Sequence, residues 1–282
     1  MINNNSSLAA EFWEQGFVKD CPIIDFHAHM GLYSSAYFTD NSAKQQLKQM
    51  DRCNIQLLLF AGHEAFLMPS SEHQADIAAV VSYPNRLKSY FAINGNSPNL
   101  KKDYERFINN PDIFVGLKYL PDYVKIPLTA DCYKPFFEYI DHHKMLFLCH
   151  TWDSLMNGPK NIEEFIKLYP NIKIIAGHSF HGDWEGAVRL CNSHDNLFLE
   201  LTAVPDERGA VEFLLEKCGS ERLLFGSDMP WFHTHYYIGA LLSIDMTDDD
   251  RRNIFYKNGE KLLNHYDWFK NIQQNYKDKE NR

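Results

Sequence analysis

The sequence lacks the features that membrane proteins and nucleic-acid-binding proteins require. No apolar run approaches the roughly 20 residues that span a bilayer, and the opening stretch MINNNSSLAAEFWEQGF has no positive segment followed by an apolar one. The formal net charge is -9, and no basic tract or Lys/Arg stripe is available to follow a phosphate backbone. We therefore expect a soluble cytoplasmic protein whose partner is neither a membrane nor a nucleic acid.

No C-x-x-C pair occurs, and the cysteines are scattered along the chain. Several of them lie inside apolar runs, which is typical of reduced, buried thiols rather than of a disulfide framework. The six positions are Cys21, Cys53, Cys132, Cys149, Cys191 and Cys218.

The sequence also contains no internal repeat, no low-complexity tract and no linker rich in proline and glycine. Its 282 residues are 45% apolar and include 20 Phe and 15 Tyr, which is enough material for a large core. An α/β barrel of roughly 250 residues commonly folds as one unit. We predict a single domain over residues 1–282, with a barrel over about 22–265 and a polar tail, NIQQNYKDKENR, that frays.

Short apolar runs of strand length alternate with longer segments whose apolar residues recur at helical spacing. This alternation occurs eight times, which predicts an α/β protein with the (β/α)8, or TIM, barrel fold. A doubly wound open sheet is the alternative. The eight runs lie at residues 22–27, 55–62, 87–95, 113–120, 145–150, 172–178, 196–201 and 222–228.

Residue types that bind metals stand at the ends of these runs. Alternate residues of an extended chain share a face, so His27 and His29 in DFHAH project together. His150, His178 and Asp228 close the fifth, sixth and eighth runs. The carboxyl ends of barrel strands meet at one rim, and imidazoles with a carboxylate suit Zn, Mn or Fe. The pattern indicates a metal site, although a His-x-His pair is also common as two histidines satisfied by their neighbours.

Five segments resemble the metal-dependent amidohydrolase superfamily. They are DFHAH in the first run, CH in the fifth, AGH in the sixth, FGSDMPW at the eighth, and NGEKLL near the end, spread over residues 23–263. Within the superfamily the chain looks most like the amidohydrolase-related branch, which contains small-substrate hydrolases and non-oxidative decarboxylases of aromatic acids.

The resemblance implies a divalent metal ion, zinc in first place with manganese or iron as alternatives, held by His27, His29, His150 and Asp228. It places His178 nearby, either as a ligand of a second ion or as a neutral group that orients water or polarises the scissile carbonyl. The second role is favoured because this branch commonly uses one ion. A metal-bound water ionises near neutral pH, and Asp228 can take its proton and pass it to the leaving group.

Lys118, in the fourth run, bears on the number of ions. Lysines at this place in the superfamily can form a carbamate that bridges two ions. Unmodified, Lys118 could contact an anionic substrate, or it could snorkel to the rim without a role. His63, after the second run, is either a substrate contact or an ordinary loop histidine. Asp25, two residues before His27 on the same face of the strand, could orient a metal-ligating imidazole or satisfy polar groups of the barrel.

Tryptophans follow three of the strand ends. Trp152, Trp184 and Trp231 come after the fifth, sixth and eighth runs. They could wall an organic substrate, and packing in the core is the ordinary alternative.

We therefore expect an enzyme, a metal-dependent hydrolase that cleaves a C–N or C–O bond of an amide, lactone or ester in a small, anionic organic substrate. A metal-dependent decarboxylase of an aromatic or unsaturated carboxylic acid is the alternative. A barrel that binds a metal or ligand without turnover is the third candidate. The expected partner is a small-molecule substrate, and a homodimer is the default assembly.

Overall fold

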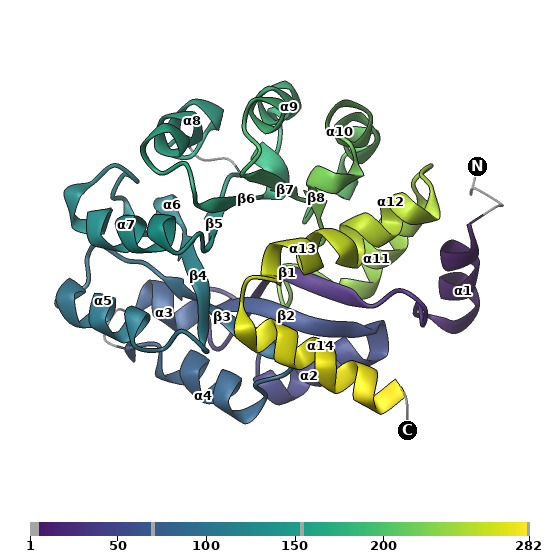
Figure 1. Ribbon diagram of the computed structural model, residues 1–282, viewed down its shortest axis with the longest axis horizontal. Coiled ribbons are helices and arrows are strands. Elements are labelled where there is room, and N and C mark those ends of the chain that lie inside the picture. The colour runs from purple at the N-terminus through teal and green to yellow at the C-terminus, as the bar shows by residue number, and fades with distance from the viewer. Residues whose placement is uncertain (1–5, 69–70, 153–154, 281–282) are drawn as a thin grey trace.

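Eight parallel strands form one sheet in the order β1-β2-β3-β4-β5-β6-β7-β8, so that each strand pairs with the next one along the chain. The computed structural model describes residues 6–68, 71–152 and 155–280. In it the first and last strands also meet, because Phe26 N donates to Phe225 O at 3.0 Å and Ala28 forms a parallel bridge with Met229. The sheet thus closes, with helices outside it (Figure 1). The fold is the predicted single-domain TIM barrel, and the open doubly wound alternative is wrong.

The strands are buried along almost their whole length, as parallel strands covered by helices outside and by a core inside must be. Their bounds are β1 (Ile23–Met30), β2 (Ile55–Gly62), β3 (Leu87–Ala92), β4 (Phe114–Tyr119), β5 (Leu146–His150), β6 (Lys173–Gly177), β7 (Leu197–Glu200) and β8 (Leu223–Leu224).

The eighth run contains far less regular strand than the sequence predicted. Only Leu223 and Leu224 belong to β8, and the chain then turns until Asp228 has a left-handed φ of 51°. Backbone hydrogen bonds from Asp228 N to His27 O (2.6 Å) and from His29 N to Met229 O (2.7 Å) keep this segment beside β1. These bonds fix the backbone of the segment. Because the segment is not a regular strand, the direction of the Asp228 side chain is not set by the alternation of strand residues.

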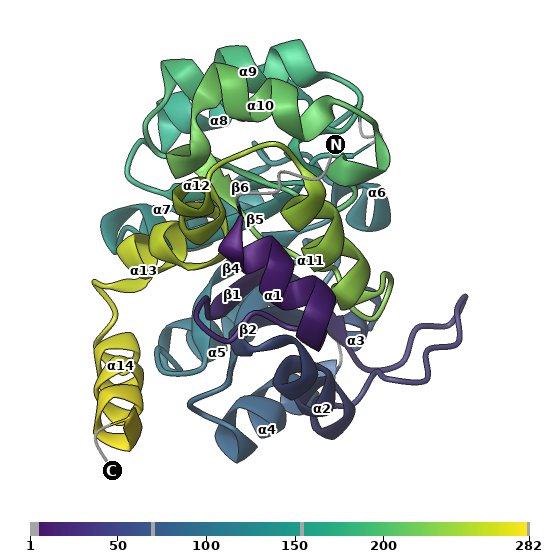
Figure 2. The same ribbon diagram turned by 90° about the vertical axis from the view of Figure 1, so that its right-hand side faces the viewer.

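Helices follow the strands around the outside of the barrel. Figure 2 shows an additional helix before the barrel, α1, lying against α11; the sequence analysis did not predict it. The helices are α1 (Ser7–Gln15), α2 (Ala43–Cys53), α3 (His63–Leu67), α4 (Gln74–Ser82), α5 (Leu100–Ile108), α6 (Pro121–Val124), α7 (Lys134–His142), α8 (Pro159–Leu168), α9 (Trp184–Ser193), α10 (Ala210–Cys218), α11 (Thr234–Ser243), α12 (Asp248–Arg252), α13 (Asn258–Leu263) and α14 (Asp267–Glu280).

The polar tail does not fray as predicted, because α14 continues through it to Glu280. Trp268, Phe269 and Ile272 are buried in the same apolar cluster as Ile24 and other residues that fill the barrel interior. Figure 1 shows α14 in front of β2. Burial of these three apolar side chains at helical spacing holds the helix on the barrel.

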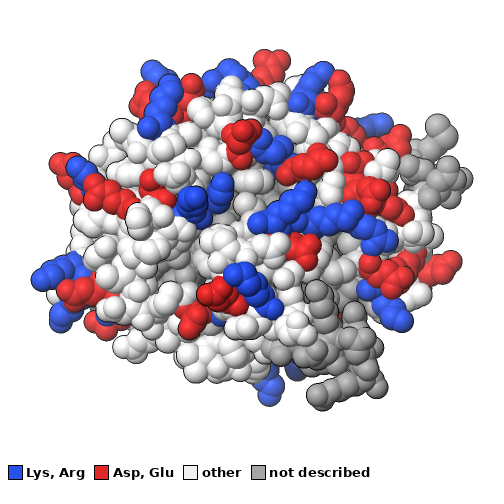
Figure 3. Space-filling model, in the orientation of Figure 1, with Lys and Arg blue, Asp and Glu red and all other residues white. Residues whose placement is uncertain are grey.

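The surface carries charge of both signs. On the face shown in Figure 3, Lys and Arg side chains are interspersed with Asp and Glu side chains, apart from a short row of Lys and Arg side chains to the right of the centre. Among the residues described, no helix combines the length and the apolar content that a bilayer-spanning segment requires. All six cysteines are free thiols.

Candidate metal centre and active pocket

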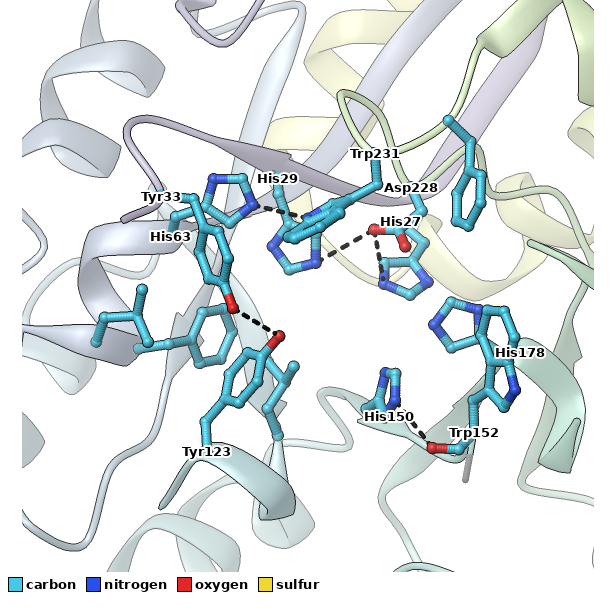
Figure 4. Close-up of a pocket in the computed structure, with 14 residues that line it drawn as sticks. His27, His29, Tyr33, His63, Tyr123, His150, Trp152, His178, Asp228 and Trp231 are labelled. Carbon is cyan, nitrogen blue, oxygen red and sulfur yellow. Dashed lines mark hydrogen bonds and ion pairs between the residues drawn. The ribbon is translucent and has the colours of Figure 1, made fainter. Parts of the chain in front are cut away.

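Two histidines of β1 point into one pocket at the carboxyl end of the barrel (Figure 4). His27 Nδ1 lies 2.7 Å from Glu200 Oε2, and His29 Nδ1 lies 3.0 Å from the carbonyl oxygen of Ala61. A carboxylate and a carbonyl can only accept, so each Nδ1 carries a proton and each Nε2 keeps its lone pair. The alternation of DFHAH therefore presents two imidazole donors on one side of the strand.

Asp228 faces these two imidazoles from the segment after β8. Its Oδ1 lies 3.5 Å from His27 Nε2 and 3.3 Å from His29 Nε2. Among the described residues Oδ1 has no hydrogen-bond partner, although it is buried. Burial raises the pKa of Asp228 well above its ordinary value, against the opposing charge of Lys118. Lone pairs that face one another across a buried gap are unfavourable unless a cation or a proton lies between them.

His178 joins this group from the end of β6. Its backbone is left-handed, with a φ of 68°, and its N–H donates to Glu200 Oε2 at 3.1 Å. Its Nδ1 donates to the carbonyl oxygen of Thr202 at 3.2 Å, which again leaves Nε2 with the lone pair. One ligand atom each from His27, His178 and Asp228 lies within 4.8 Å of the other two. This arrangement fits a single divalent ion bound by nitrogen and oxygen donors.

Glu200, at the carboxyl end of β7, holds two of these histidines, and the sequence analysis missed it. Its Oε2 accepts from His27 and His178, and its Oε1 accepts from the backbone N–H and the hydroxyl of Thr202, both at 2.5 Å. The side chain is completely buried. The available signal was a lone glutamate one residue before the end of the apolar run NLFLEL, near the place where other runs end in His or Asp. A carboxylate bound to a metal-ligating imidazole fixes its tautomer and raises its basicity.

Asp25 does not orient the imidazole of His27. Its oxygens accept from the backbone N–H of His27 at 3.1 Å and from the N–H and hydroxyl of Ser227 at 3.1 and 2.6 Å. Burial raises the pKa of Asp25 to about 7. Of the two expected roles, Asp25 has the second: it satisfies polar groups of the barrel and ties β1 to the segment after β8.

His150 adjoins this group of donors through His178, with the two ring centroids 4.8 Å apart. Its Nε2 lies 3.1 Å from the carbonyl oxygen of Trp152 and therefore carries the proton. Only Nδ1 of His150 is left to act as a donor to an ion. In His27, His29 and His178 the nitrogen available to an ion is instead Nε2.

Lys118 is completely buried, and its Nζ lies 2.6 Å from His27 Nε2. The snorkelling alternative is therefore wrong, because the amino group does not reach solvent. Lys118 is also not among the described residues that line the pocket, so its amino group reaches the Nε2 of His27 without being exposed to the pocket. Burial lowers the pKa of Lys118 to about 8. The amino group and a metal ion compete for the same lone pair of His27.

The histidines of the site are in the form that binds metals. Burial lowers the pKa values of His27, His29 and His178 well below the ordinary histidine value, and it lowers that of His150 to about 4. All four imidazoles are therefore neutral at neutral pH. Neutral imidazole is the ligating species, so protonation does not oppose metal binding here.

The pocket above the donors is small and aromatic, with a volume of about 180 Å³. No lysine or arginine is among its described lining residues, so a distant anionic group of a substrate meets no cationic side chain there. The hydroxyl of Tyr33 donates to that of Tyr123 at 3.3 Å across the pocket. The lining residues are His27, His29, Tyr33, His63, Phe66, Leu67, Leu120, Tyr123, His150, Trp152, His178, Asp228, Trp231 and Phe232.

The remaining candidates from the sequence divide between the pocket and the exterior. His63 lines the pocket, but its Nδ1 donates to the carbonyl oxygen of Gly31 at 3.1 Å and its Nε2 accepts from Trp231 Nε1 at 2.9 Å. Both of its polar atoms are thus already used within the protein. Trp152 and Trp231 form part of the wall, whereas Trp184 lies on α9 and is not among the described lining residues.

Comparison with known sequences gives one match. The model of the amidohydrolase family matches residues 24–264. No curated protein matches the chain.

Solved structures with similar folds include both hydrolases and decarboxylases. A 2,6-dihydroxybenzoate decarboxylase from Rhizobium has a TM-score of 0.68 at 13% identity, over 86% of this chain and 99% of that one. A probable 2-pyrone-4,6-dicarboxylic acid hydrolase from Acinetobacter baumannii has a TM-score of 0.63 at 17% identity, over 86% and 99%. A 5-carboxyvanillate decarboxylase from Novosphingobium aromaticivorans, complexed with manganese, has a TM-score of 0.61 at 15% identity, over 80% and 79%. At these identities the similarity shows the fold.

Proposed function

Because this chain belongs to the amidohydrolase family, we propose that it is a metal-dependent hydrolase that cleaves a C–N or C–O bond, in an amide, lactone or ester, of a small aromatic substrate. The observation that carries this proposal is the buried, unpartnered Oδ1 of Asp228, which faces the Nε2 atoms of His27 and His29 on the floor of the pocket. Among the described residues, Lys118 Nζ contacts one of these donors, His27 Nε2, but no group is hydrogen-bonded to Asp228 Oδ1, so an ion between the donors would balance their lone pairs.

The residues that would hold the ion are His27, His29, His178 and Asp228, with His150 beside them. Zinc is the proposed ion, and manganese is the second choice because a structural neighbour was crystallised with it. A divalent ion at this place supplies a Lewis acid that polarises an oxygen of the substrate and lowers the pKa of a water molecule. Glu200 supports the binding by keeping His27 in the tautomer with a free Nε2.

In the proposed reaction Asp228 moves the proton. The carboxylate oxygen that does not hold the ion accepts a proton from the attacking water and returns it to the nitrogen or oxygen atom that leaves. The segment after β8 holds Asp228 for this task by the hydrogen bond from its backbone N–H to His27 O.

His178 acts as an acceptor in this scheme. Its Nδ1 proton is committed to Thr202, so Nε2 can bind an ion or accept a hydrogen bond from water. Donation to a substrate carbonyl would need a second proton on the ring, which burial opposes. This assigns His178 to the ion or to the water, and not to the scissile carbonyl.

Decarboxylation of a single-ring aromatic acid is the second candidate. It is favoured by the aromatic walls, because an apolar pocket destabilises a carboxylate relative to the dispersed charge of the transition state. Two of the structural neighbours described above are decarboxylases. A dicarboxylic substrate fits less well, because the described lining offers no lysine or arginine to a second carboxylate.

The test is incubation of the zinc-loaded and the manganese-loaded protein with aryl amides, aryl lactones and hydroxybenzoates in ¹⁸O-labelled water. Incorporation of ¹⁸O into an acid product supports hydrolysis. Release of carbon dioxide without that incorporation supports decarboxylation. If the protein holds a stoichiometric amount of neither zinc nor manganese after reconstitution, the proposal is overturned for both reactions.

A further inference from the structure

A second hollow lies beside the active pocket. Its volume is about 410 Å³, against about 180 Å³ for the active pocket. It is bounded by the segment after β1, the start of α2 and residues 229–234. Of the described residues, Trp231 and Phe232 line both hollows. These two side chains are thus the wall that separates them.

Trp231 is held in this wall from several directions. Its indole N–H donates to His63 Nε2 at 2.9 Å, and its backbone N–H donates to Asp228 O at 2.9 Å. The indole also meets Tyr33 and Phe38 edge to face, with ring centroids 5.0 and 4.8 Å apart and interplanar angles of 71° in both cases. Edge-to-face contacts of this kind add to the energy of burial. Trp231 is 37% exposed, so these contacts, rather than enclosure in the core, keep the ring in place.

His63 serves as the fixed anchor for the indole. Its ring stacks between His29, at 5.0 Å and 8°, and Phe38, at 5.4 Å and 17°. The carbonyl oxygen of Gly31 takes the proton of Nδ1, so Nε2 is the acceptor that the indole N–H requires. His63 therefore positions Trp231 and has no free ring nitrogen for a hydrogen bond to substrate.

We propose that Trp231, anchored by His63, determines the size of substrate that this site accepts. The closed wall restricts the active pocket to molecules with a single ring, and its removal joins the pocket to the neighbouring hollow. A volume of about 180 Å³ lies below the roughly 300–1,000 Å³ of sites that hold drug-sized ligands. The two hollows together reach that range. This inference rests on the proposed function only in taking the pocket to be the active site.

The test compares the binding of phenol and 2-naphthol, two neutral probes that differ by one fused ring, by isothermal titration calorimetry on the full chain. Neutral probes bind to the walls whether or not an ion is present, so zinc-loaded and metal-free protein are both measured. The quantity compared is the ratio of the association constant for 2-naphthol to that for phenol. In Trp231→Ala we expect this ratio to rise at least tenfold over the unaltered protein.

Three further variants distinguish the effect of the Trp231 ring from the effect of its hydrogen bond to His63. Trp231→Phe keeps a ring in the wall and should leave the ratio within about threefold of the original, since a ring still closes most of the gap. His63→Phe keeps the stack between His29 and Phe38 but removes the acceptor, and should raise the ratio by an intermediate amount. Trp152→Ala, on a wall that does not adjoin the second hollow, should weaken both probes without raising the ratio.

An unchanged ratio in Trp231→Ala, or an equal rise in Trp152→Ala, overturns the inference. So does the absence of measurable phenol binding in every folded variant. Failure of the proposed function is distinguishable, because it appears as a lack of bound metal while the ratio still responds to Trp231. Circular dichroism and thermal melting establish that each variant is folded.

Discussion

Glu200 Oε2 lies 2.7 Å from His27 Nδ1, and both side chains are buried almost completely. This contact joins β7 to β1 across the barrel and directs the free Nε2 of His27 toward Asp228. A metal-ligating histidine commonly donates its other N–H to a carboxylate, and the loss of that carboxylate weakens metal binding.

We predict that Glu200→Gln weakens zinc binding by roughly 10- to 100-fold, because the neutral amide supports the imidazole less well than a carboxylate does. Competition with a chromophoric chelator measures this affinity. Glu216→Gln, at an exposed site on α10, is the control and should bind zinc as tightly as the unaltered protein. Equal affinities for the two variants would contradict the role assigned to Glu200.

Asp228→Asn is expected to lower turnover at least roughly 100-fold, because the amide cannot accept and return the proton. The variant should melt at or above the temperature of the metal-free unaltered protein, since it removes a buried carboxylate oxygen without a partner. Activity is measured on whichever aryl amide, lactone or hydroxybenzoate the protein converts. Retained turnover in a folded variant would exclude the proton role and favour a binding protein without catalysis.

Lys118→Met tests the contact between Lys118 Nζ and His27 Nε2. Removal of a buried amino group from this position should tighten zinc binding at least tenfold, because the ion no longer competes with it for the lone pair of His27. Lys88→Met is the matched control, since Lys88 is also a buried lysine but donates to the carbonyl oxygen of Asp112. If Lys118→Met instead loses zinc, the lysine is a metal ligand in its carboxylated form, and bicarbonate should stimulate binding in the unaltered protein.

The four buried histidines should make the metal-free protein less stable as the pH falls below neutrality, in opposition to Asp25 and Asp228, whose raised pKa values favour proton uptake by the folded state. In the unfolded chain histidine binds a proton near its ordinary pKa of about 6.5. In the folded chain burial lowers the pKa of His150 to about 4 and shifts those of His27, His29 and His178 in the same direction. At these histidines the unfolded state therefore binds more protons as the pH falls through 6.5, so their contribution to the free energy of unfolding decreases until each folded pKa is reached.

For His150 alone, this effect amounts to roughly 2 kcal/mol between pH 7 and pH 5. Urea denaturation at the two pH values, with zinc removed by a chelator, measures the loss. His150→Phe should lose less stability over this interval than the unaltered protein. His142→Asn, at an exposed position on α7, should lose the same amount. An equal change in His150→Phe and in the unaltered protein between pH 7 and pH 5 would contradict the expected burial effect.

Phe269→Ala should lower the free energy of unfolding by about 3–5 kcal/mol, the usual cost of truncating a buried aromatic side chain. Phe269 lies on α14 and is only 2% exposed within the inner cluster. Trp13→Ala, at a position that is 56% exposed, should cost much less. A small and equal effect of both changes on the urea midpoint would mean that α14 does not stabilise the barrel.

The fold was predictable because its signals are local and repeat along the chain. Apolar runs of strand length alternate with helical patterns, and a barrel is the fold that this alternation favours. The same periodicity gave two wrong expectations in the C-terminal part of the chain. The apolar residues of α14 stand just before and within a polar segment, and the short β8 contains only two regular strand residues.

The site was predictable in part. His27 and His29 share a face because strand geometry has a period of two, and the rim position of His178 and Asp228 follows from their place at strand ends. Glu200 was missed because a single glutamate in an apolar run has no motif around it. The role of Asp25 stayed open because strand alternation places it on the face of His27 but does not say which atoms it meets.

The sequence by itself determined which residues the rim of the barrel carries, because strand period and helix period are properties of neighbouring residues. Only the tertiary structure decided which of their atoms meet. The approach of Lys118 to His27, the bond between His27 and Glu200, and the wall formed by Trp231 join residues far apart in the chain. Such contacts depend on closure of the barrel and on the left-handed backbone at His178 and Asp228. Neither can be predicted from the local periodicity of the sequence.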